Sequence, residues 1–330
     1  MIRLPGLVDL QVNGFAGVDF SSPDLTRADA VKACGELSRR GVAGFLPTII
    51  TSSEETYARN LPILADLASD AQFGGMILGI HAEGPFISKE PGAVGAHNPA
   101  WARNPDRTFL GRMMEWSAGS IRMLTIAAEL PGAEALAAYA VSRGIVVALG
   151  HQLAGAADLA RVAQAGARLI THFGNGMPNL VHRHENILWA GLAEDRLGLS
   201  LITDGHHLPP SIIKTALRVK GVQQIVVVSD ASPAAGLPPG RYHVLGNEAV
   251  LEPSGRLHNP EKACLVGSSA SILECANYLL AQLLATPEEV AALCLHNPLR
   301  LLGRRESDLP HRPGIHYDSA TKGFVLDSEG

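Results

Sequence analysis

Residues 145–172, IVVALGHQLAGAADLARVAQAGARLITH, contain the unit that decides the fold. The unit begins with a short apolar run at Ile145–Leu149 and ends with another at Arg168–Ile170, and a helical stretch lies between them. The first run leads into Gly150-His151 and the second into Thr171-His172. Apolar runs without alternation are typical of parallel strands covered on both faces. The segment therefore predicts strand, helix and strand in succession, with a histidine after each strand.

The same order of elements recurs along the chain. Eight short runs fit the strand pattern: Gly6–Val12, Gly44–Ile50, Met76–His81, Ile121–Ala127, Ile145–Leu149, Arg168–Ile170, Gly198–Ile202 and Gln224–Val228. Ser22-Pro23 and Pro210, between these runs, and Pro287, after the last of them, are expected to open helices, since proline favours the first helical position. Eight alternations predict an α/β fold of the (β/α)₈ TIM-barrel type, with a doubly wound open sheet as the alternative.

Two segments depart from this rhythm. Residues 241–262 contain turn-forming glycines and a Pro-Ser-Gly sequence, which predict a β-hairpin insertion after the eighth strand. Residues 303–330 are weakly patterned and predict a C-terminal tail with a short hairpin. We therefore expect one barrel domain over residues 1–302, followed by the tail.

Composition limits the class of protein. A chain of 330 residues with 46% hydrophobic and 18% charged residues can bury a large core. Its net charge of −5 argues against nucleic acid as a partner. The four cysteines show no C-x-x-C spacing, the N-terminus shows no signal-peptide pattern, and no apolar run is long enough to cross a bilayer. We therefore expect a cytoplasmic protein without a membrane partner.

Polar residues follow the predicted strands, whose carboxyl ends meet at one face of a parallel barrel. Glu83, His151 and His172 offer one carboxylate and two imidazoles, a set that suits a catalytic zinc or similar ion with an open position for water. Asp230, which follows the eighth strand, is placed to act as a general base. His81 lies on the same strand face as Glu83, either as a supporting partner or as packing.

Two loops add weaker signals. Ala96–Pro99 carries His97 after the third strand. The glycine-rich run Gly174–Pro178 follows His172, and Arg183 comes shortly after it. Such a run can direct backbone N–H groups toward an anion, and an arginine can add a charge-assisted contact. Glycine-rich loops often only turn the chain, so this signal is weak by itself.

Several stretches match a known family in their order along the chain. They are GLVDLQVNGFAGVDF, FLPTIITS, HAEGPF, GAHNP, the Gly-His pair at 150–151, THFGNGMP, TDGHH, VSDA and VGSSAS, between about residue 5 and about residue 300. Together they resemble the N-acetylglucosamine-6-phosphate deacetylases of the amidohydrolase superfamily. The combination is specific, whereas no single stretch is.

The resemblance implies roles for the residues after the strands. Glu83, His151 and His172 would hold one divalent metal ion, which we expect to be zinc. Asp230 would be the catalytic acid and base, and His97 would stabilise the oxyanion together with the metal. The reaction implied is hydrolysis of the acetamide of N-acetylglucosamine 6-phosphate to glucosamine 6-phosphate and acetate.

The resemblance also implies how a small-molecule amino-sugar phosphate would bind. His97 and His207 match substrate-contacting histidines, and Asn175, Gly176 and Arg183 match the part of the pattern that engages sugar and phosphate. The arginine would reach the site of a neighbouring subunit, so a homodimer is expected. The alternatives are a deacetylase of galactosamine 6-phosphate or of an unphosphorylated amino sugar, and a non-catalytic sugar-phosphate-binding homologue.

The sequence departs from the usual pattern in three places. Gln11 and Asn13 stand where many superfamily members carry His-x-His, and since both are poor zinc ligands we expect one metal ion and not two. The first barrel strand comes almost at Met1, so the family's small β-sandwich domain is expected to be missing or much reduced. His206 replaces an apolar residue, which affects the expected substrate fit.

Overall fold

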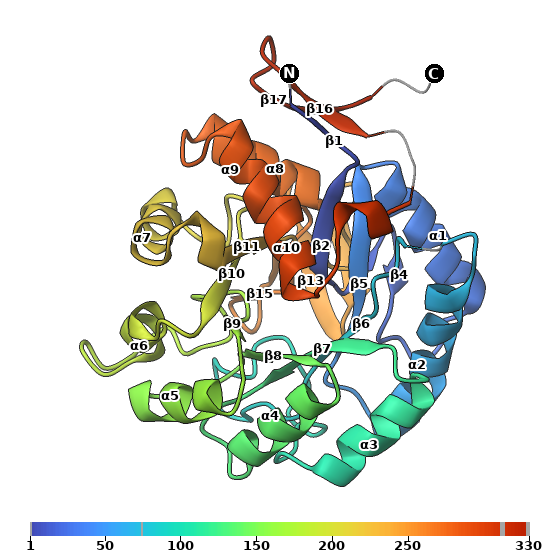
Figure 1. The fold of residues 1–330 in the computed structure, drawn as a ribbon. Coiled ribbons are helices and arrows are strands. Elements are labelled where there is room, and N and C mark those ends of the chain that lie inside the picture. The colour runs from blue at the N-terminus through green and yellow to red at the C-terminus, as the bar shows by residue number, and fades with distance from the viewer. Residues whose placement is uncertain (1, 74, 311–313, 328–330) are drawn as a thin grey trace.

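The computed structural model describes residues 2–73, 75–310 and 314–327. Eight parallel strands form one sheet in the order β11-β10-β9-β8-β7-β6-β5-β2, with helices around it (Figure 1). The strands are β2 (Leu7–Val12), β5 (Val42–Ile50), β6 (Ile80–Glu83), β7 (Ile121–Ile126), β8 (Val146–Leu149), β9 (Leu169–Ile170), β10 (Gly198–Ile202) and β11 (Ile225–Val228). Each overlaps one predicted strand.

The first and last strands approach each other and nearly close the sheet. Val12 and Ala231 form a parallel bridge, and the Asn13 N–H donates to the Ala231 carbonyl at 2.8 Å. Below this bridge the Ser229 N–H donates to the Asp9 carboxyl at 3.1 Å. The prediction of a parallel (β/α)₈ barrel is confirmed, and the open doubly wound sheet is not observed.

The third barrel strand lies later in the chain than Met76–His81, where it was predicted. Ile77 forms only an isolated bridge to Phe45, and the regular strand starts at Ile80. Gly79 has a φ of 141°, and a Cβ there would lie 2.2 Å from the Arg122 side chain. This conformation, which favours glycine, interrupts the extended run. The strand therefore ends at Glu83 and carries it directly to the barrel mouth.

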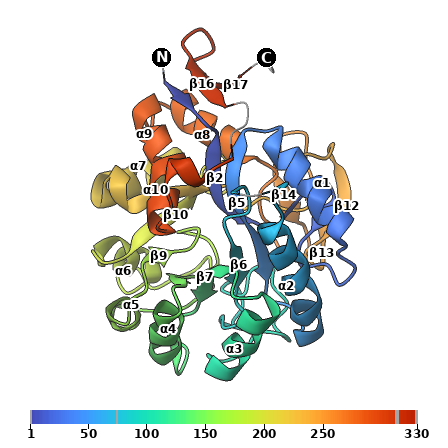
Figure 2. The same cartoon turned by 45° about the vertical axis from the view of Figure 1, so that its right-hand side comes forward.

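Helices cover the outside of the barrel in both views (Figures 1 and 2). They are α1 (Arg27–Ser38), α2 (Glu54–Ser69), α3 (Arg107–Trp116), α4 (Ala133–Ser142), α5 (Ala156–Gln164), α6 (Ile187–Ala193), α7 (Pro210–Lys220), α8 (Ile272–Ala281), α9 (Pro287–Ala291) and α10 (Asn297–Leu301). Pro210 and Pro287 open α7 and α9 as predicted. The start at Ser22-Pro23 is wrong, because α1 begins after Thr26, which forms a reciprocal capping box with Asp29.

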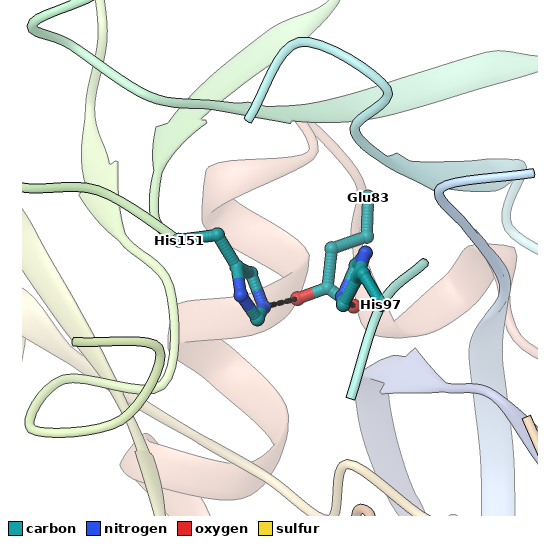
Figure 3. A group of neighbouring side chains, drawn as sticks. All are labelled: Glu83, His97 and His151. Atoms are coloured by element: carbon teal, nitrogen blue, oxygen red, sulfur yellow. Dashed lines mark ion pairs between the residues drawn. The ribbon is translucent and has the colours of Figure 1, made fainter. Parts of the chain in front are cut away.

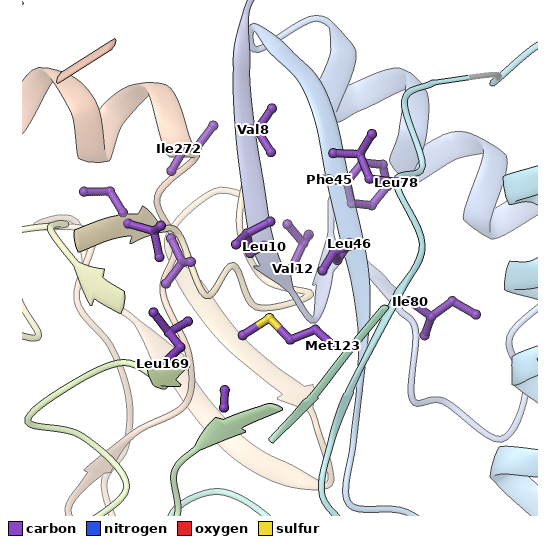
Figure 4. Packing of buried hydrophobic residues seen from close by; sticks show 14 of the residues in the cluster. Val8, Leu10, Val12, Phe45, Leu46, Leu78, Ile80, Met123, Leu169 and Ile272 are labelled. Atoms are coloured by element: carbon purple, nitrogen blue, oxygen red, sulfur yellow. The ribbon is translucent and has the colours of Figure 1, made fainter. Parts of the chain in front are cut away.

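The core combines apolar side chains from the strands with those of the surrounding helices. All residues of β2 and β5 are buried, as expected of strands covered on both faces. Figure 4 shows part of this packing, with Val8, Leu10, Val12, Phe45, Leu46, Leu78, Ile80, Met123, Leu169 and Ile272 labelled. This packing holds the strand ends, and hence the polar residues after them, in fixed positions.

Three small sheets lie outside the barrel strands. The insertion is longer than the predicted hairpin at 241–262, because β12 (Gly240–Val244), β13 (Asn247–Leu251), β14 (Leu257–Asn259) and β15 (Cys264–Leu265) form a four-stranded antiparallel sheet. The strands β3 (Gly14–Phe15) and β4 (Val18–Asp19) form a short pair. The third sheet joins β1 (Arg3–Leu4), β16 (Ile315–Asp318) and β17 (Gly323–Leu326), next to both termini (Figure 1).

Residues 303–330 contain the predicted hairpin as β16 and β17, but residues 311–313 and 328–330 of the expected tail lie outside the described residues. The division into a barrel over 1–302 and a tail, and the reduction of a second domain, stay predictions. Among the described residues, no helix is long and apolar enough to cross a membrane.

Asp9 gives the fold an unusual pH dependence. Burial raises its pKa to about 7, and hydrogen bonds from Ser229 and Gln11 offset only part of the shift. The folded state holds a proton on Asp9 that the unfolded chain releases near pH 4. The contribution of Asp9 to the free energy of unfolding is therefore fully present below pH 4 and is lost as pH rises toward 7. Asp9→Asn should remove this loss, which is on the order of 1–4 kcal/mol.

The measurement is the difference in Tm between Asp9→Asn and the parent chain, both metal-free, from pH 5 to pH 8. The difference should shift in favour of the variant as pH rises. Asp24→Asn makes the same chemical change at an exposed position and serves as the control. A difference for Asp9→Asn that does not vary with pH would contradict the assignment.

Candidate active site

Glu83, His151 and His172 meet at the carboxyl ends of β6, β8 and β9. Glu83 Oε1 lies 3.2 Å from His151 Nε2 and 3.0 Å from His172 Nε2, and the two nitrogens are 3.1 Å apart. A tetrahedral zinc ion with bonds of about 2.0–2.1 Å places its ligand atoms about 3.3 Å apart. The triangle of three buried atoms therefore has the size that a divalent ion requires.

The tautomer of His151 favours a cation at this position. His151 Nδ1 lies 2.8 Å from the Ala93 carbonyl, which can only accept, so Nδ1 donates. In the neutral ring, Nε2 then presents a lone pair toward Glu83 and His172. Lone pairs facing one another at these distances repel unless a proton or a metal ion lies between them. A backbone carbonyl that orients a histidine in this way is typical of metal sites.

The backbone at the site is strained. The backbone φ values of His151, His172 and Asp230 are 51°, 31° and 52°, in the region that residues other than glycine rarely adopt. Each such residue costs about 1–3 kcal/mol, which the surrounding packing must offset. Other non-glycine residues with positive φ, such as Ala118 and Leu283, lie elsewhere in the chain, so this strain accompanies the convergence of the three side chains and does not mark the site by itself.

Glu83 is held in its charged form. Burial alone would raise its pKa, but hydrogen bonds with His151 and His172 outweigh that effect and hold the pKa well below its usual range. The same carboxylate raises the pKa of His172 against the effect of burial. Gln11 Nε2 donates to Glu83 Oε1 at 2.8 Å and fixes its orientation. Gln11 thus supports Glu83 from the end of the first barrel strand.

His97 offers an alternative grouping with the same carboxylate. Possible ligand atoms of Glu83, His97 and His151 all lie within 4.8 Å of one another (Figure 3). His97 Nε2 is 3.7 Å from Glu83 Oε2, which is longer than the contacts of His172. The Thr51 N–H donates to His97 Nδ1 at 3.3 Å, so the neutral ring carries its proton on Nε2. His97 therefore presents a donor to the site, whereas a metal ligand needs a free lone pair.

Asp230 lies beside this cluster at the end of β11. Its pKa is raised to about 6, mainly by burial, and the negative charge of Glu83 contributes to the same shift. Asn13 Nδ2 donates to Asp230 Oδ1 at 2.7 Å, which holds the side chain in one orientation. A carboxyl group with a pKa near neutrality can both accept and return a proton.

The residues predicted to bind substrate differ in where the structure places them. His207 Nδ1 contacts Asp204 Oδ2 at 2.8 Å, and Ser268, which donates to Asp204 from Oγ, also donates from its N–H to the Asp230 carbonyl, so His207 belongs to the same mouth. A Cβ on Gly176 would lie 3.0 Å from the His172 ring, so glycine permits this loop to pass over the ligands. Asn175 directs its amide back to the His172 carbonyl at 3.2 Å, and Arg183 is exposed.

Other polar residues turn out to support the site. His81, which the sequence left open, lies beneath it and contacts Thr125 Oγ1 at 2.8 Å and the Leu10 carbonyl at 3.1 Å. Burial lowers the pKa of His81 to about 4, so the ring is neutral. His206 Nε2 contacts the Ser254 carbonyl of the insertion at 3.1 Å. Apolar patterning does not predict that Gln11 and Asn13 act as hydrogen-bond partners of Glu83 and Asp230, although their two-residue spacing places both on one strand face.

A nearly closed parallel barrel with a carboxylate, imidazoles and an acid–base group at the carboxyl ends of its strands is the arrangement of a metal-dependent amidohydrolase. Comparison with known proteins agrees with this class. No family model matches the chain. The chain is 32% identical to N-acetylglucosamine-6-phosphate deacetylase of Danio rerio over 335 residues, which cover 98% of this chain and 80% of the relative.

Two further comparisons extend this result. The chain is 31% identical to N-acetylgalactosamine-6-phosphate deacetylase of Escherichia coli O157:H7, covering 91% of this chain and 78% of the relative. The solved structure of a Mycobacterium smegmatis N-acetyl-D-glucosamine-6-phosphate deacetylase variant in complex with N-acetyl-D-glucosamine-6-phosphate has a TM-score of 0.83 and 28% identity. That match covers 92% of this chain and 78% of the other. The chain therefore belongs to the N-acetylglucosamine-6-phosphate deacetylase family.

Proposed function

We propose that this protein hydrolyses the acetamide of N-acetylglucosamine 6-phosphate to glucosamine 6-phosphate and acetate. The observation that carries the proposal is the convergence of Glu83, His151 and His172 within 3.2 Å, beside Asp230. Burying these groups together is costly unless they hold a cation and perform chemistry. The family relationship supports the amide and the sugar phosphate as the substrate.

One divalent ion, which we take to be zinc, would be held by Glu83, His151 and His172. The donor set of one carboxylate and two imidazoles suits zinc and leaves a position for water. When bound, the ion lowers the pKa of a water molecule and polarises a carbonyl oxygen. Gln11 and Asn13 are engaged with Glu83 and Asp230, so neither amide is free to help hold a second ion.

Asp230 and His97 then perform the proton transfer and the electrostatic stabilisation. With a pKa of about 6, Asp230 is largely a carboxylate at neutral pH and accepts the proton of the attacking water. It returns that proton to the amide nitrogen, because an amide anion is too basic to leave. His97 Nε2–H donates to the oxyanion that forms at the acetyl carbonyl. The Thr51 N–H fixes this tautomer of His97.

The phosphate is assigned to the opposite end of the sugar, toward His207 and the loop of Asn175 and Gly176, where backbone N–H groups can contribute. Arg183 lies on an exposed loop, and no hydrogen bond or ion pair forms at its guanidinium within the described part of the chain. Leu180 and Trp189, on the same loop and the helix after it, are 92% and 57% exposed. These apolar side chains support a homodimer in which Arg183 reaches the partner's phosphate site.

The substrate is tested by comparing kcat/KM on four N-acetyl sugars: glucosamine and galactosamine, each with and without the 6-phosphate. We expect the phosphorylated glucosamine derivative to be the best substrate. A preference for the galactosamine epimer would change the assigned sugar, and indifference to the phosphate would contradict the sugar-phosphate assignment. Failure to cleave any of the four would favour the non-catalytic homologue.

Arg183→Ala should raise KM for the phosphorylated sugar by about 10- to 100-fold, because a charge-assisted hydrogen bond to phosphate contributes about 1.5–3 kcal/mol. KM for the unphosphorylated sugar should change little. Arg143→Ala, which removes an exposed arginine at the end of α4, is the matched control. An equal effect of Arg183→Ala on both substrates would show that Arg183 is an ordinary surface residue.

A cytoplasmic location is also proposed. Its support is the cysteine chemistry: Cys264, Cys275 and Cys294 are free thiols, and two of them are buried. Reduced cysteines are typical of an intracellular protein.

A further inference from the structure

Asp204 has no assigned role, yet its carboxylate accepts four hydrogen bonds at the mouth of the barrel. It follows β10, and its Oδ1 accepts from the backbone N–H groups of His206 and His207, each at 2.9 Å. Its Oδ2 accepts from His207 Nδ1 at 2.8 Å and from Ser268 Oγ at 2.9 Å. The side chains of Asp204 and His207 are only 3% and 4% exposed. Each lone pair of the carboxylate is therefore used.

These contacts determine the protonation of both groups. Burial alone would raise the pKa of Asp204, but the hydrogen bonds from His207 outweigh it and hold the pKa well below its usual range. An ionised carboxylate only accepts, so His207 Nδ1 must carry a proton. Nε2 is then the ring nitrogen left for a ligand, and it can donate only when the ring is an imidazolium.

Ser268 ties this pair to the strand that carries Asp230. The Ala270 N–H donates to Ser268 Oγ at 3.0 Å, so the hydroxyl hydrogen is free to donate to Asp204. The Ser268 N–H donates to the Asp230 carbonyl at 2.9 Å, and Ser268 forms a parallel bridge with Ala231. The same residue therefore fixes the backbone of Asp230 and the orientation of Asp204.

We propose that Asp204 is a positioning residue that, with Ser268, fixes His207 with a proton on Nδ1 and directs Nε2 to the anionic end of the substrate, which the ring binds as an imidazolium. This inference rests on the proposed function, because it assigns the phosphate as the group that His207 meets. Asp204 touches no reacting atom, so its effect passes through His207 and concerns substrate affinity more than turnover.

Asp204→Asn tests the proposal. The two backbone N–H groups require an oxygen on their side, so the amide NH₂ must face His207. It then donates to Nδ1, and the ring becomes neutral with its proton on Nε2. We expect KM for N-acetylglucosamine 6-phosphate to rise about 10- to 100-fold, the range of one lost charge-assisted bond. KM for unphosphorylated N-acetylglucosamine and kcat should stay within about twofold.

Two further variants separate positioning from a general structural effect. In a His207→Gln background, Asp204→Asn should cause no additional rise in KM, because the residue through which it acts is gone. Ser268→Ala removes one of the four hydrogen bonds and should raise the same KM by a smaller factor. Ser269→Ala removes a neighbouring hydroxyl that donates to the Gly255 carbonyl, and should leave both substrates unaffected.

The ¹⁵N spectrum of His207 gives a readout that does not depend on the substrate. Nδ1 should be protonated in the parent protein and unprotonated in Asp204→Asn. An unchanged Nδ1 signal, an equal loss on both sugars, or a full additional loss in the His207→Gln background would overturn the proposal. If the parent protein shows no preference for the phosphate, the proposed substrate fails, and the ¹⁵N signal still decides whether Asp204 sets the state of His207.

Discussion

Asp230→Asn is expected to lower kcat by about 10²- to 10⁴-fold while the protein keeps its metal, because a general acid–base group contributes about that factor. The amide has the size of the carboxylate and can still accept the hydrogen bond from Asn13 that orients Asp230. It cannot accept the proton of the attacking water or return one to the amine. The loss should therefore fall on the chemical step and not on substrate binding.

Asp19→Asn is the matched control for this variant. Asp19 is the last residue of β4, and burial raises its pKa to about 6, as for Asp230. Its oxygens accept from the backbone N–H groups of Ser21 and Leu245 and take no part in the proposed chemistry. Asp19→Asn should retain kcat within about twofold. Near-normal turnover in Asp230→Asn, with metal bound, would remove Asp230 from the mechanism.

His172→Ala and His97→Ala should separate a metal ligand from a substrate-facing donor. Removing a partner that only orients a ligand typically weakens metal binding about 10- to 100-fold. Removing the ligand His172 itself should weaken metal binding by more than that factor and abolish activity. His97→Ala should keep the metal and lose about 10²- to 10³-fold in kcat, the usual effect of one oxyanion donor. Metal content after dialysis, measured by elemental analysis beside kcat, distinguishes the two.

The opposite result for the two histidine variants would identify a different set of metal ligands. If His97→Ala loses the metal and His172→Ala keeps it, the ion is bound by the alternative grouping of Glu83, His97 and His151. The tautomer argued for His97 from the Thr51 contact would then be wrong. The barrel and the position of the site at its mouth would be unaffected.

The position of the site could be predicted because barrel topology brings strand ends together. Glu83, His151 and His172 are separated by up to 89 positions, yet each follows a short apolar run. Once these runs are parallel strands of one barrel, their carboxyl ends must share a face. The convergence of these three side chains with Asp230 needed no knowledge of loop structure.

The hydrogen-bond partners of these residues could not be predicted in the same way. Gln11 reaches Glu83 across 72 positions and Asn13 reaches Asp230 across 217. Whether two such side chains meet depends on the stagger of the closing strands, which apolar patterning does not determine. The contact of Asp204 with Ser268 depends in addition on where the chain returns after the four-stranded insertion.

The helix start at Ser22-Pro23 and the early third strand were wrong for different reasons. Ser22 and Pro23 have the composition of a helix start, but Ser22 Oγ accepts from the Asp24 N–H in a turn, and the capping box four residues later is stronger. The third strand was placed too early because the apolar residues before Gly79 resemble a strand. The left-handed conformation of Gly79 is a tertiary feature that composition does not reveal.

The most direct test of the central claim is product analysis with metal-loaded protein and N-acetylglucosamine 6-phosphate. Acetate and free primary amine should be released in equal amounts, at a rate proportional to bound metal up to one ion per chain. Removing the metal with a chelator should abolish the release, and adding one equivalent of zinc should restore it. If folded protein carrying one ion per chain releases neither acetate nor amine, the proposed deacetylase function is contradicted.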